Sequence, residues 1–361
     1  MRIMSQTTNL NAKAAQVDMK ARARFLWVAT ATVITIYSLI LVGGIVRATG
    51  AGMGCPDWPK CFDQWIPPTA ESQLPADYQT VYANRGYADT TFNVRKTWTE
   101  YLNRLLGVFT GFTILLTLLF SNPYRRTDPT VFWLSFAGFI LVGVQGWLGS
   151  RVVASNLNPA MITVHMLLAQ VIVGLLIWSL LRATVPAADL VNTRSKDHSD
   201  ARKSVSELPG WVFPVLVFAT LAGLVQLVLG TQVREGIDLI AKQSNNENRH
   251  LWIETLPLVF SIHKWLALPL AVFNGWLIVN LLGRTSSGLL RKLVLGLAFL
   301  LVATIVLGMS MDRLNLPIFA QPLHLWFASL IFGVQWAMLI VLYQVRKPVA
   351  HTESLSTASV H

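Results

Sequence analysis

The stretch SIHKWLALPLAVFNG, at 261–275, places His263 near the start of an apolar run, and QPLHLWFASLIFG, at 321–333, does the same with His324. Two earlier stretches repeat the pattern: EYLNRLLGVFTG (100–111) with Asn103 and ITVHMLLAQVIVG (162–174) with His165. Asn103 precedes His263 by 160 residues and His165 precedes His324 by 159, so the two offsets differ by one residue. The flanking sequences LGSRVVASNLNPA (148–160) and LGMSMDRLNLPIF (307–319) keep this register. The chain therefore contains two related halves, one with a His pair and one with an Asn/His pair.

The composition places these halves in a membrane. The 361 residues are 53% hydrophobic and only 13% charged, which does not resemble a soluble domain of this size. One crossing of a bilayer takes about 20 apolar residues. The sequence predicts an all-α polytopic membrane protein with eight crossings, near 25–46, 98–120, 130–149, 160–182, 211–233, 256–283, 289–310 and 317–345.

Each half is predicted to be a four-helix bundle. Four crossings separate equivalent points, so the two bundles have the same orientation and form a parallel repeat. The predicted organisation comprises a polar N-terminus (1–24), the first half (25–182) with a large outer loop (47–97), a charged linker (183–210), the second half (211–345) and a polar tail (346–361).

The distribution of Lys and Arg predicts the orientation. With the N-terminus in the cytoplasm, 17 of the 29 Lys and Arg lie in cytoplasmic segments, so nearly all of the net charge of +11 is cytoplasmic. Both chain ends are then cytoplasmic, and the four ligand positions lie toward the outer face. The basic residues are spread over short loops, which does not favour a nucleic-acid-binding function.

His263 and His324 suit a haem with two axial imidazoles, which requires two histidines projecting from different helices onto opposite faces of the porphyrin. Zinc is disfavoured, because no thiol or carboxylate accompanies these histidines at ligand spacing. The alternative is that each histidine is buried and hydrogen-bonded to a neighbouring helix. Ionisable side chains within a membrane are costly, and they mark functional sites by default.

The first half differs at one ligand position. An amide is a poor iron ligand, so His165 would be the only strong ligand there and one face of the iron would stay open or weakly held. Electron transfer suits two strong ligands, whereas oxidative chemistry suits an open face. Glu100 lies one helical turn before Asn103 and is a candidate for proton transfer. The alternatives are that Asn103 caps or packs near its helix start and that Glu100 is solvated there.

Two further pairs are candidates. Cys55 and Cys61, in CPDWPKC of the outer loop, are the only cysteines, and an oxidising compartment favours a disulfide between them. Its role is either redox-active, as in strained exposed disulfides, or a structural staple. Arg47 and Arg234 follow the first and fifth crossings at similar places, where a guanidinium either binds a haem propionate or lies at the interface.

The motifs GGIVRATGAGMGCPDWPKC, EYLNRLLG, ITVHMLLA, SIHKW and PLHLW together resemble the haem A synthase family over residues 25–345. The resemblance implies oxidation of the C8 methyl of haem O to a formyl group. It also implies a haem B cofactor on His263 and His324, and a substrate site in the first half with His165. The family's segment-two Glu maps onto Glu100 and its outer-loop thiols onto Cys55 and Cys61.

One motif departs from the family. The family usually has E-x-x-H-R in its second segment, whereas this chain has Glu100, Asn103 and Arg104. The departure puts ligation of the substrate haem by two histidines in doubt, although a single proximal ligand is compatible with activity.

The resemblance implies haem O as substrate, with haem O synthase and an electron acceptor as further partners, in the cytoplasmic (inner) membrane of a bacterium. The site would face the periplasmic side. Homo-oligomerisation stays open. Two alternative functions are a transmembrane electron-transfer cytochrome, which predicts one haem near each face, and a membrane thiol oxidoreductase, which needs no intramembrane histidine.

Overall fold

The computed structural model describes residues 17–88, 90–184, 208–244, 247–285 and 288–346. Most of the predicted N-terminus, linker and tail lies outside these residues. Eight helices of the described residues are long and apolar enough to cross a membrane, which confirms the all-α fold with eight crossings. They are α2 (Met19–Ala48), α4 (Val94–Ser121), α6 (Pro129–Ala154), α7 (Pro159–Thr184), α9 (Val212–Gln243), α10 (Leu258–Leu282), α11 (Gly288–Arg313) and α12 (Ala320–Arg346). The parallel repeat and the sidedness stay predictions.

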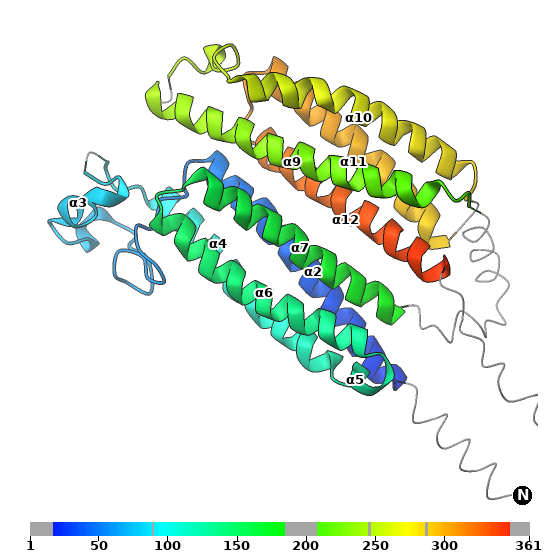
Figure 1. Cartoon of the computed structure of the whole chain (residues 1–361). Coiled ribbons are helices and arrows are strands. Elements are labelled where there is room, and N and C mark those ends of the chain that lie inside the picture. The colour runs from blue at the N-terminus through cyan, green and yellow to red at the C-terminus, as the bar shows by residue number, and fades with distance from the viewer. Residues whose placement is uncertain (1–16, 89, 185–207, 245–246, 286–287, 347–361) are drawn as a thin grey trace, which may run out of the picture.

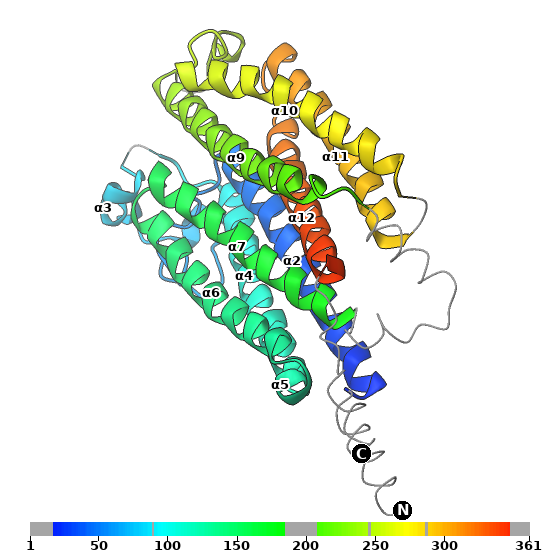
Figure 2. The same ribbon diagram turned by 45° about the vertical axis from the view of Figure 1, so that its right-hand side comes forward.

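The long helices form two groups that lie side by side (Figures 1 and 2). The helices α2, α4, α6 and α7 make the first group, and α9, α10, α11 and α12 make the second. The loop between α2 and α4, with the short helix α3 (Tyr78–Val81), projects from one end of the first group, opposite the end at which α2 begins. The short helix α5 (Tyr124–Thr127) joins α4 to α6 at the other end.

The outer surfaces of both groups are apolar. Apolar side chains such as Leu119, Val279 and Val302 are at least 59% exposed, as a lipid-facing surface requires. Polar side chains of the same helices pair inside. One example is the 2.8 Å hydrogen bond between the hydroxyls of Thr32 on α2 and Thr117 on α4. Small hydroxylated residues of this kind let membrane helices approach closely.

The helix α12 joins the two groups, since it packs against α2 and α7 as well as against α9 and α11. Trp326 Nε1 donates to the Tyr37 carbonyl and Trp336 Nε1 to the Gly174 carbonyl, both at 2.9 Å. Gln170 and Ser329 exchange two buried hydrogen bonds across the same interface. The halves are therefore fixed to one another by specific polar contacts within an apolar interface.

The segment between the fifth and sixth predicted crossings, 234–255, is partly helical. The fifth crossing was expected to end near residue 233, but α9 continues to Gln243. The extension is amphipathic: Ile237 is buried against Trp252 and Leu316, while an ion pair joins Arg234 to Asp238 one turn later. Arg234 therefore lies within a helix, and Arg47 likewise lies in the last turn of α2.

The loop between α2 and α4 has its own small core. Phe62 is buried at the centre and meets four aromatic rings edge-on at centroid distances of 5.3–6.4 Å: Tyr78, Tyr82, Tyr87 and Phe92. Burial raises the pKa of Tyr82 to about 12, with Asp57 and Asp63 adding to the shift. The loop is therefore a packed structure above the end of the first group.

Candidate functional site

One cavity of about 2300 Å³ extends through both groups of helices. Pockets for a single drug-sized ligand have volumes of about 300–1,000 Å³, so this cavity has room for two large ligands. Seven of the nine predicted site residues line it: Arg47, Glu100, Asn103, His165, Arg234, His263 and His324. Cys55 and Cys61 do not line it. The cavity therefore brings both predicted ligand pairs to one internal space.

All four ligand positions lie within the first ten residues of their helices. His263 is the sixth residue of α10 and His324 the fifth of α12. His165 is the seventh residue of α7 and Asn103 the tenth of α4. Such placement near the helix starts brings the ligand positions to comparable depths.

The rings of His263 and His324 face each other across the second group. Their centroids are 6.3 Å apart and their planes are inclined by 69°. A metal bound at an imidazole nitrogen, at about 2 Å, lies about 3 Å from the ring centroid, so two rings on opposite sides of one iron have centroids about 6 Å apart. The observed spacing fits a single iron between the two rings.

A hydrogen bond orients the ring of His324, whereas at His263 the hydrogen bond is made to the backbone. Nδ1 of His324 lies 3.0 Å from the carbonyl oxygen of Thr304 on α11. A carbonyl only accepts, so Nδ1–H donates and Nε2 keeps its lone pair for a metal. Nδ1 of His263 is buried without a hydrogen-bond partner, while Gln226 on α9 donates to the His263 backbone carbonyl at 2.8 Å. Both rings are thus poised to act as ligands.

Each ligand position faces a glycine on the preceding spanning helix. A Cβ atom added at the glycine would lie 3.2–4.0 Å from the ring or amide in the four pairs Gly43/Asn103, Gly149/His165, Gly230/His263 and Gly308/His324. The absence of a side chain leaves room for an imidazole and for a flat ligand beside it. Gly43 preserves this arrangement opposite Asn103, although no imidazole is present there.

The first half presents unpaired polar atoms to the cavity. Gln145 on α6 donates to the backbone carbonyl of His165 at 2.9 Å, as Gln226 does for His263. Three buried atoms of cavity-lining residues in this half have no hydrogen-bond partner: Oε1 of Gln145, Nδ1 of His165 and Oδ1 of Asn103. Buried polar groups are normally paired, so these atoms point to a ligand in the cavity. Asn103 thus faces the cavity and does not cap its helix; Asn93 caps α4, accepting from Lys96 N–H at 3.1 Å.

Glu100 is not solvated, because it is only 3% exposed. Its Oε2 accepts from the Cys55 backbone N–H at 2.8 Å, and its Oε1 accepts from Arg104 Nε at 3.1 Å. Arg104 also donates to backbone carbonyls of the outer loop at Cys55, Asp57 and Lys60. The pair therefore ties the outer loop to α4 while the carboxylate lines the cavity.

Cys55 and Cys61 form the predicted disulfide, with Cα atoms 4.8 Å apart. The bond is not exposed, since both cysteines are fully buried in the aromatic core of the loop. Thiol exchange requires access to a sulfur atom, and the loop would have to open to give it. Burial favours the structural interpretation over the redox one.

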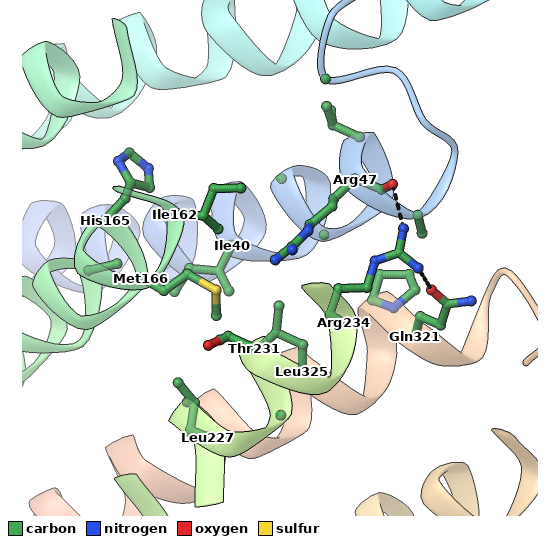
Figure 3. A pocket seen from close by; sticks show the side chains of 18 of the residues that line it. Ile40, Arg47, Ile162, His165, Met166, Leu227, Thr231, Arg234, Gln321 and Leu325 are labelled. Atoms are coloured by element: carbon green, nitrogen blue, oxygen red, sulfur yellow. Dashed lines mark hydrogen bonds between the residues drawn. The ribbon is translucent and has the colours of Figure 1, made fainter. Parts of the chain in front are cut away.

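Arg47 and Arg234 meet where the two groups join (Figure 3). Both contact Asp238 on α9, and Arg234 also donates to the Arg47 carbonyl at 3.1 Å and to Gln321 on α12. Figure 3 shows His165 and Met166 on the other side of this part of the cavity, with Leu227 and Thr231 of α9 nearby. Both arginines can therefore reach an anionic group in the cavity.

Sequence reasoning missed Gln145, Gln226, Asp238 and the glycines opposite the ligand positions. The glycines had a signal, because each lies near the C-terminal end of the crossing that precedes a ligand position: Gly43, Gly149, Gly230 and Gly308. The amides had none, since a lone Gln in an apolar segment does not show which carbonyl it contacts.

Comparison with known proteins gives a consistent result. Residues 24–336 match the COX15-CtaA family, described as cytochrome oxidase assembly protein. The chain is 26% identical over 303 residues to "Heme A synthase" of Granulibacter bethesdensis, covering 76% of this chain and 75% of that protein. Proteins of the same name from Beijerinckia indica (25% identity, 92% and 96% covered) and Methylobacterium sp. (27%, 89% and 92%) match over nearly their whole length.

Proposed function

The chain belongs to the cytochrome oxidase assembly protein family COX15-CtaA, and on this premise we propose that its two halves hold two haems with different tasks. It is a multi-pass membrane enzyme that converts haem O to haem A for oxidase assembly. The single observation that carries the division of tasks is the asymmetry of one cavity, lined by a facing His pair in one half and by His165 with an amide in the other.

The second half is proposed to hold haem B as the resident cofactor. The 6.3 Å spacing of the His263 and His324 rings, the free Nε2 of His324 and the space left by Gly230 and Gly308 fit a porphyrin iron between them. A haem with two imidazole ligands supplies electron transfer when bound. The Thr304 carbonyl orients the ring of His324, and Gln226 holds the backbone of His263.

The first half is proposed to bind the substrate haem O, with His165 as the only strong iron ligand. Gln145 fixes the backbone of His165, and Gly149 leaves space beside its ring. Oxidation of the C8 methyl to a formyl group adds one oxygen atom. With water as the oxygen source, the reaction releases protons at the site and passes electrons to the proposed electron acceptor. Glu100 lines the cavity and is proposed to accept protons there, in addition to holding the outer loop through Cys55 N–H.

The proposed setting is the bacterial inner membrane, with the site toward the periplasmic side. The charge distribution supports this orientation, and a disulfide in the loop beside the site suits an oxidising compartment. The proposed further partners are haem O synthase and an electron acceptor.

The test compares two alanine variants of the purified protein by optical spectrum and by chromatography of the extracted haems. His165→Ala should stop the conversion of haem O to haem A and leave the low-spin spectrum of the second half. His263→Ala should remove that spectrum, because one imidazole cannot keep the iron six-coordinate. Full conversion by His165→Ala, or an unchanged spectrum in His263→Ala, would contradict the division.

A further inference from the structure

The two cavity arginines occupy equivalent places relative to the two ligand sites. Arg47 is four residues after Gly43, which faces Asn103, and Arg234 is four residues after Gly230, which faces His263. Four residues are about one turn of an α-helix. Each arginine therefore lies one turn beyond the glycine that faces the ligand position of its own half. Each arginine thus suits a carboxylate carried by the porphyrin of its half.

One carboxylate, that of Asp238, bridges these two cations. Its Oδ2 lies 3.0 Å from Nε and from Nη2 of Arg47, and its Oδ1 lies 2.5 Å from Nη2 of Arg234. Arg47 comes from α2 of the first half, whereas Arg234 and Asp238 come from α9 of the second. The bridge therefore spans the junction of the halves at the wall of the cavity.

Asp238 is the most exposed member of this group. Its side chain is 40% exposed, whereas those of Arg47 and Arg234 are 21% and 19% exposed. Arg234 is also held by Gln321 and by the Arg47 carbonyl (Figure 3). A short, partly exposed carboxylate can rotate into water at low cost, while the arginines stay in place.

We propose that Asp238 is an exchangeable placeholder, a positioning residue whose carboxylate occupies the arginine sites until a porphyrin carboxylate displaces it. The proposal rests on the proposed function, because it requires a haem carboxylate in the cavity. A carboxylate that binds Arg47 in the first half removes one partner of Asp238 and leaves the bridge to Arg234 alone. Haem O binding at Arg47 in the first half thereby changes the partner of Arg234 in the second half.

The proposed exchange predicts the direction in which the loss of the Asp238 charge changes porphyrin affinity. Asp238 competes with the incoming carboxylate and neutralises part of the charge of both arginines. Replacing Asp238 by Asn keeps the shape but removes the competitor, so binding of a carboxylate-bearing porphyrin becomes tighter. A purely structural bridge predicts the opposite, since its loss would disorder the arginines and weaken binding.

The experiment measures the dissociation constants of haem O and of its dimethyl ester by absorbance titration of the full chain in detergent. Because half-exposed ion pairs are individually weak, we expect Asp238→Asn to bind haem O roughly three- to tenfold tighter and the ester within about twofold of wild type. Asp128→Asn is the matched control: it removes the 2.7 Å ion pair to Arg182 within the first half and should change neither constant.

Adding Arg47→Gln to Asp238→Asn should abolish the gain, since the guanidinium carries the attraction. Asp238→Ser is a second neutral variant. It replaces Asp238→Asn in the titration if the Asn variant is purified without the haem of the second half. Equal or weaker haem O binding by the neutral variants would overturn the exchange. Failure of the wild-type protein to bind haem O would instead refute the proposed function, and the exchange with it.

Discussion

At the scale of single residues, the glycine opposite each ligand position determines the space beside it, because glycine has no side chain. Gly308 on α11 is the tightest case, because an added Cβ would lie 3.2 Å from Cε1 of His324. Such a contact is closer than ordinary van der Waals distance, so the ring would have to shift. The geometry of the His pair therefore depends on a residue that makes no bond to it.

We expect Gly308→Val to lower the haem content of the second half severely, since two added methyl groups must displace the His324 ring. Gly296→Val is the matched control in the same helix, because nothing lies within 4 Å of a Cβ there. The Soret absorbance per protein reports the haem content. A normal haem content in Gly308→Val would show that the ring adjusts without loss of ligation.

Asn103→His tests the meaning of the missing imidazole. A Cβ at Gly43 would lie 4.0 Å from the Asn103 amide oxygen, so the wall opposite leaves room for a larger side chain. A second imidazole should make the substrate haem six-coordinate and lower conversion, because the open face of the iron is lost. The spectrum of the haem-O-loaded protein and the conversion rate decide it. A faster rate would mean that Asn103 is a tolerated loss.

The structure places His165, His263 and His324 at the cavity, and this was predictable because an ionisable side chain in an apolar run is conspicuous. Asp238 was not predictable. It stands in a stretch that reads as a polar loop, and only the continuation of α9 places it between Arg47 and Arg234. The local sequence pattern shows the chemical character of a residue, but the packing of the helices determines which other residues it contacts.

At the scale of elements, the outer loop is attached to α4 by a guanidinium. Arg104 donates to three backbone carbonyls of the loop and to Glu100. A hydrogen bond from a charged group contributes about 1.5–3 kcal/mol to stability, so this one side chain contributes much of the attachment.

Arg104→Gln should therefore loosen the loop and let a reductant reach the Cys55–Cys61 bond. We expect reduction by dithiothreitol, followed by thiol labelling, to become at least about tenfold faster, corresponding to the loss of one charged hydrogen bond. Lys60→Gln serves as the control, since the Lys60–Asp63 pair is exposed and contributes little. Equal labelling rates in wild type and Arg104→Gln would show that aromatic packing alone keeps the loop closed.

The number of crossings was predictable from hydropathy, because eight apolar runs are separated by polar stretches. The residues at which the helices end were less predictable. Hydropathy places the end of α9 where charge begins, but burial of Ile237 against Trp252 and Leu316 carries the helix on to Gln243. The burial of Cys55 was likewise missed, since it depends on how Phe62 gathers rings from distant parts of the loop.

At the scale of the whole molecule, the two halves meet closely at Gly333 of α12. A Cβ there would overlap the hydroxyl oxygen of Tyr37 on α2, and this hydroxyl is 3.5 Å from the Ser329 carbonyl. A side chain at Gly333 would force Tyr37 out of its place, so the junction needs glycine at this point.

Gly333→Ala should destabilise the protein by about 1–3 kcal/mol, as overpacking of a close interface does, even though alanine favours helix. Thermal unfolding in detergent, followed by circular dichroism, measures the loss. Gly275→Ala on α10 is the control, because nothing lies within 4 Å of a Cβ there, and it should unfold at or slightly above the wild-type temperature. An undiminished melting temperature in Gly333→Ala would mean that the halves separate without cost.

The position of α12 has a consequence for the synthesis of the protein. Trp326, Ser329 and Trp336 of this eighth spanning helix complete the wall of the first half through Tyr37, Gln170 and Gly174. Chains emerge from the ribosome N-terminus first, so α2, α4, α6 and α7 enter the bilayer long before their partner does. Until the translocon releases α12, the first half stays unsealed along α2 and α7. We therefore expect the first half to bind haem O only after insertion of the whole chain, because a nascent protein halted after α7 would be open to lipid where the finished protein is closed.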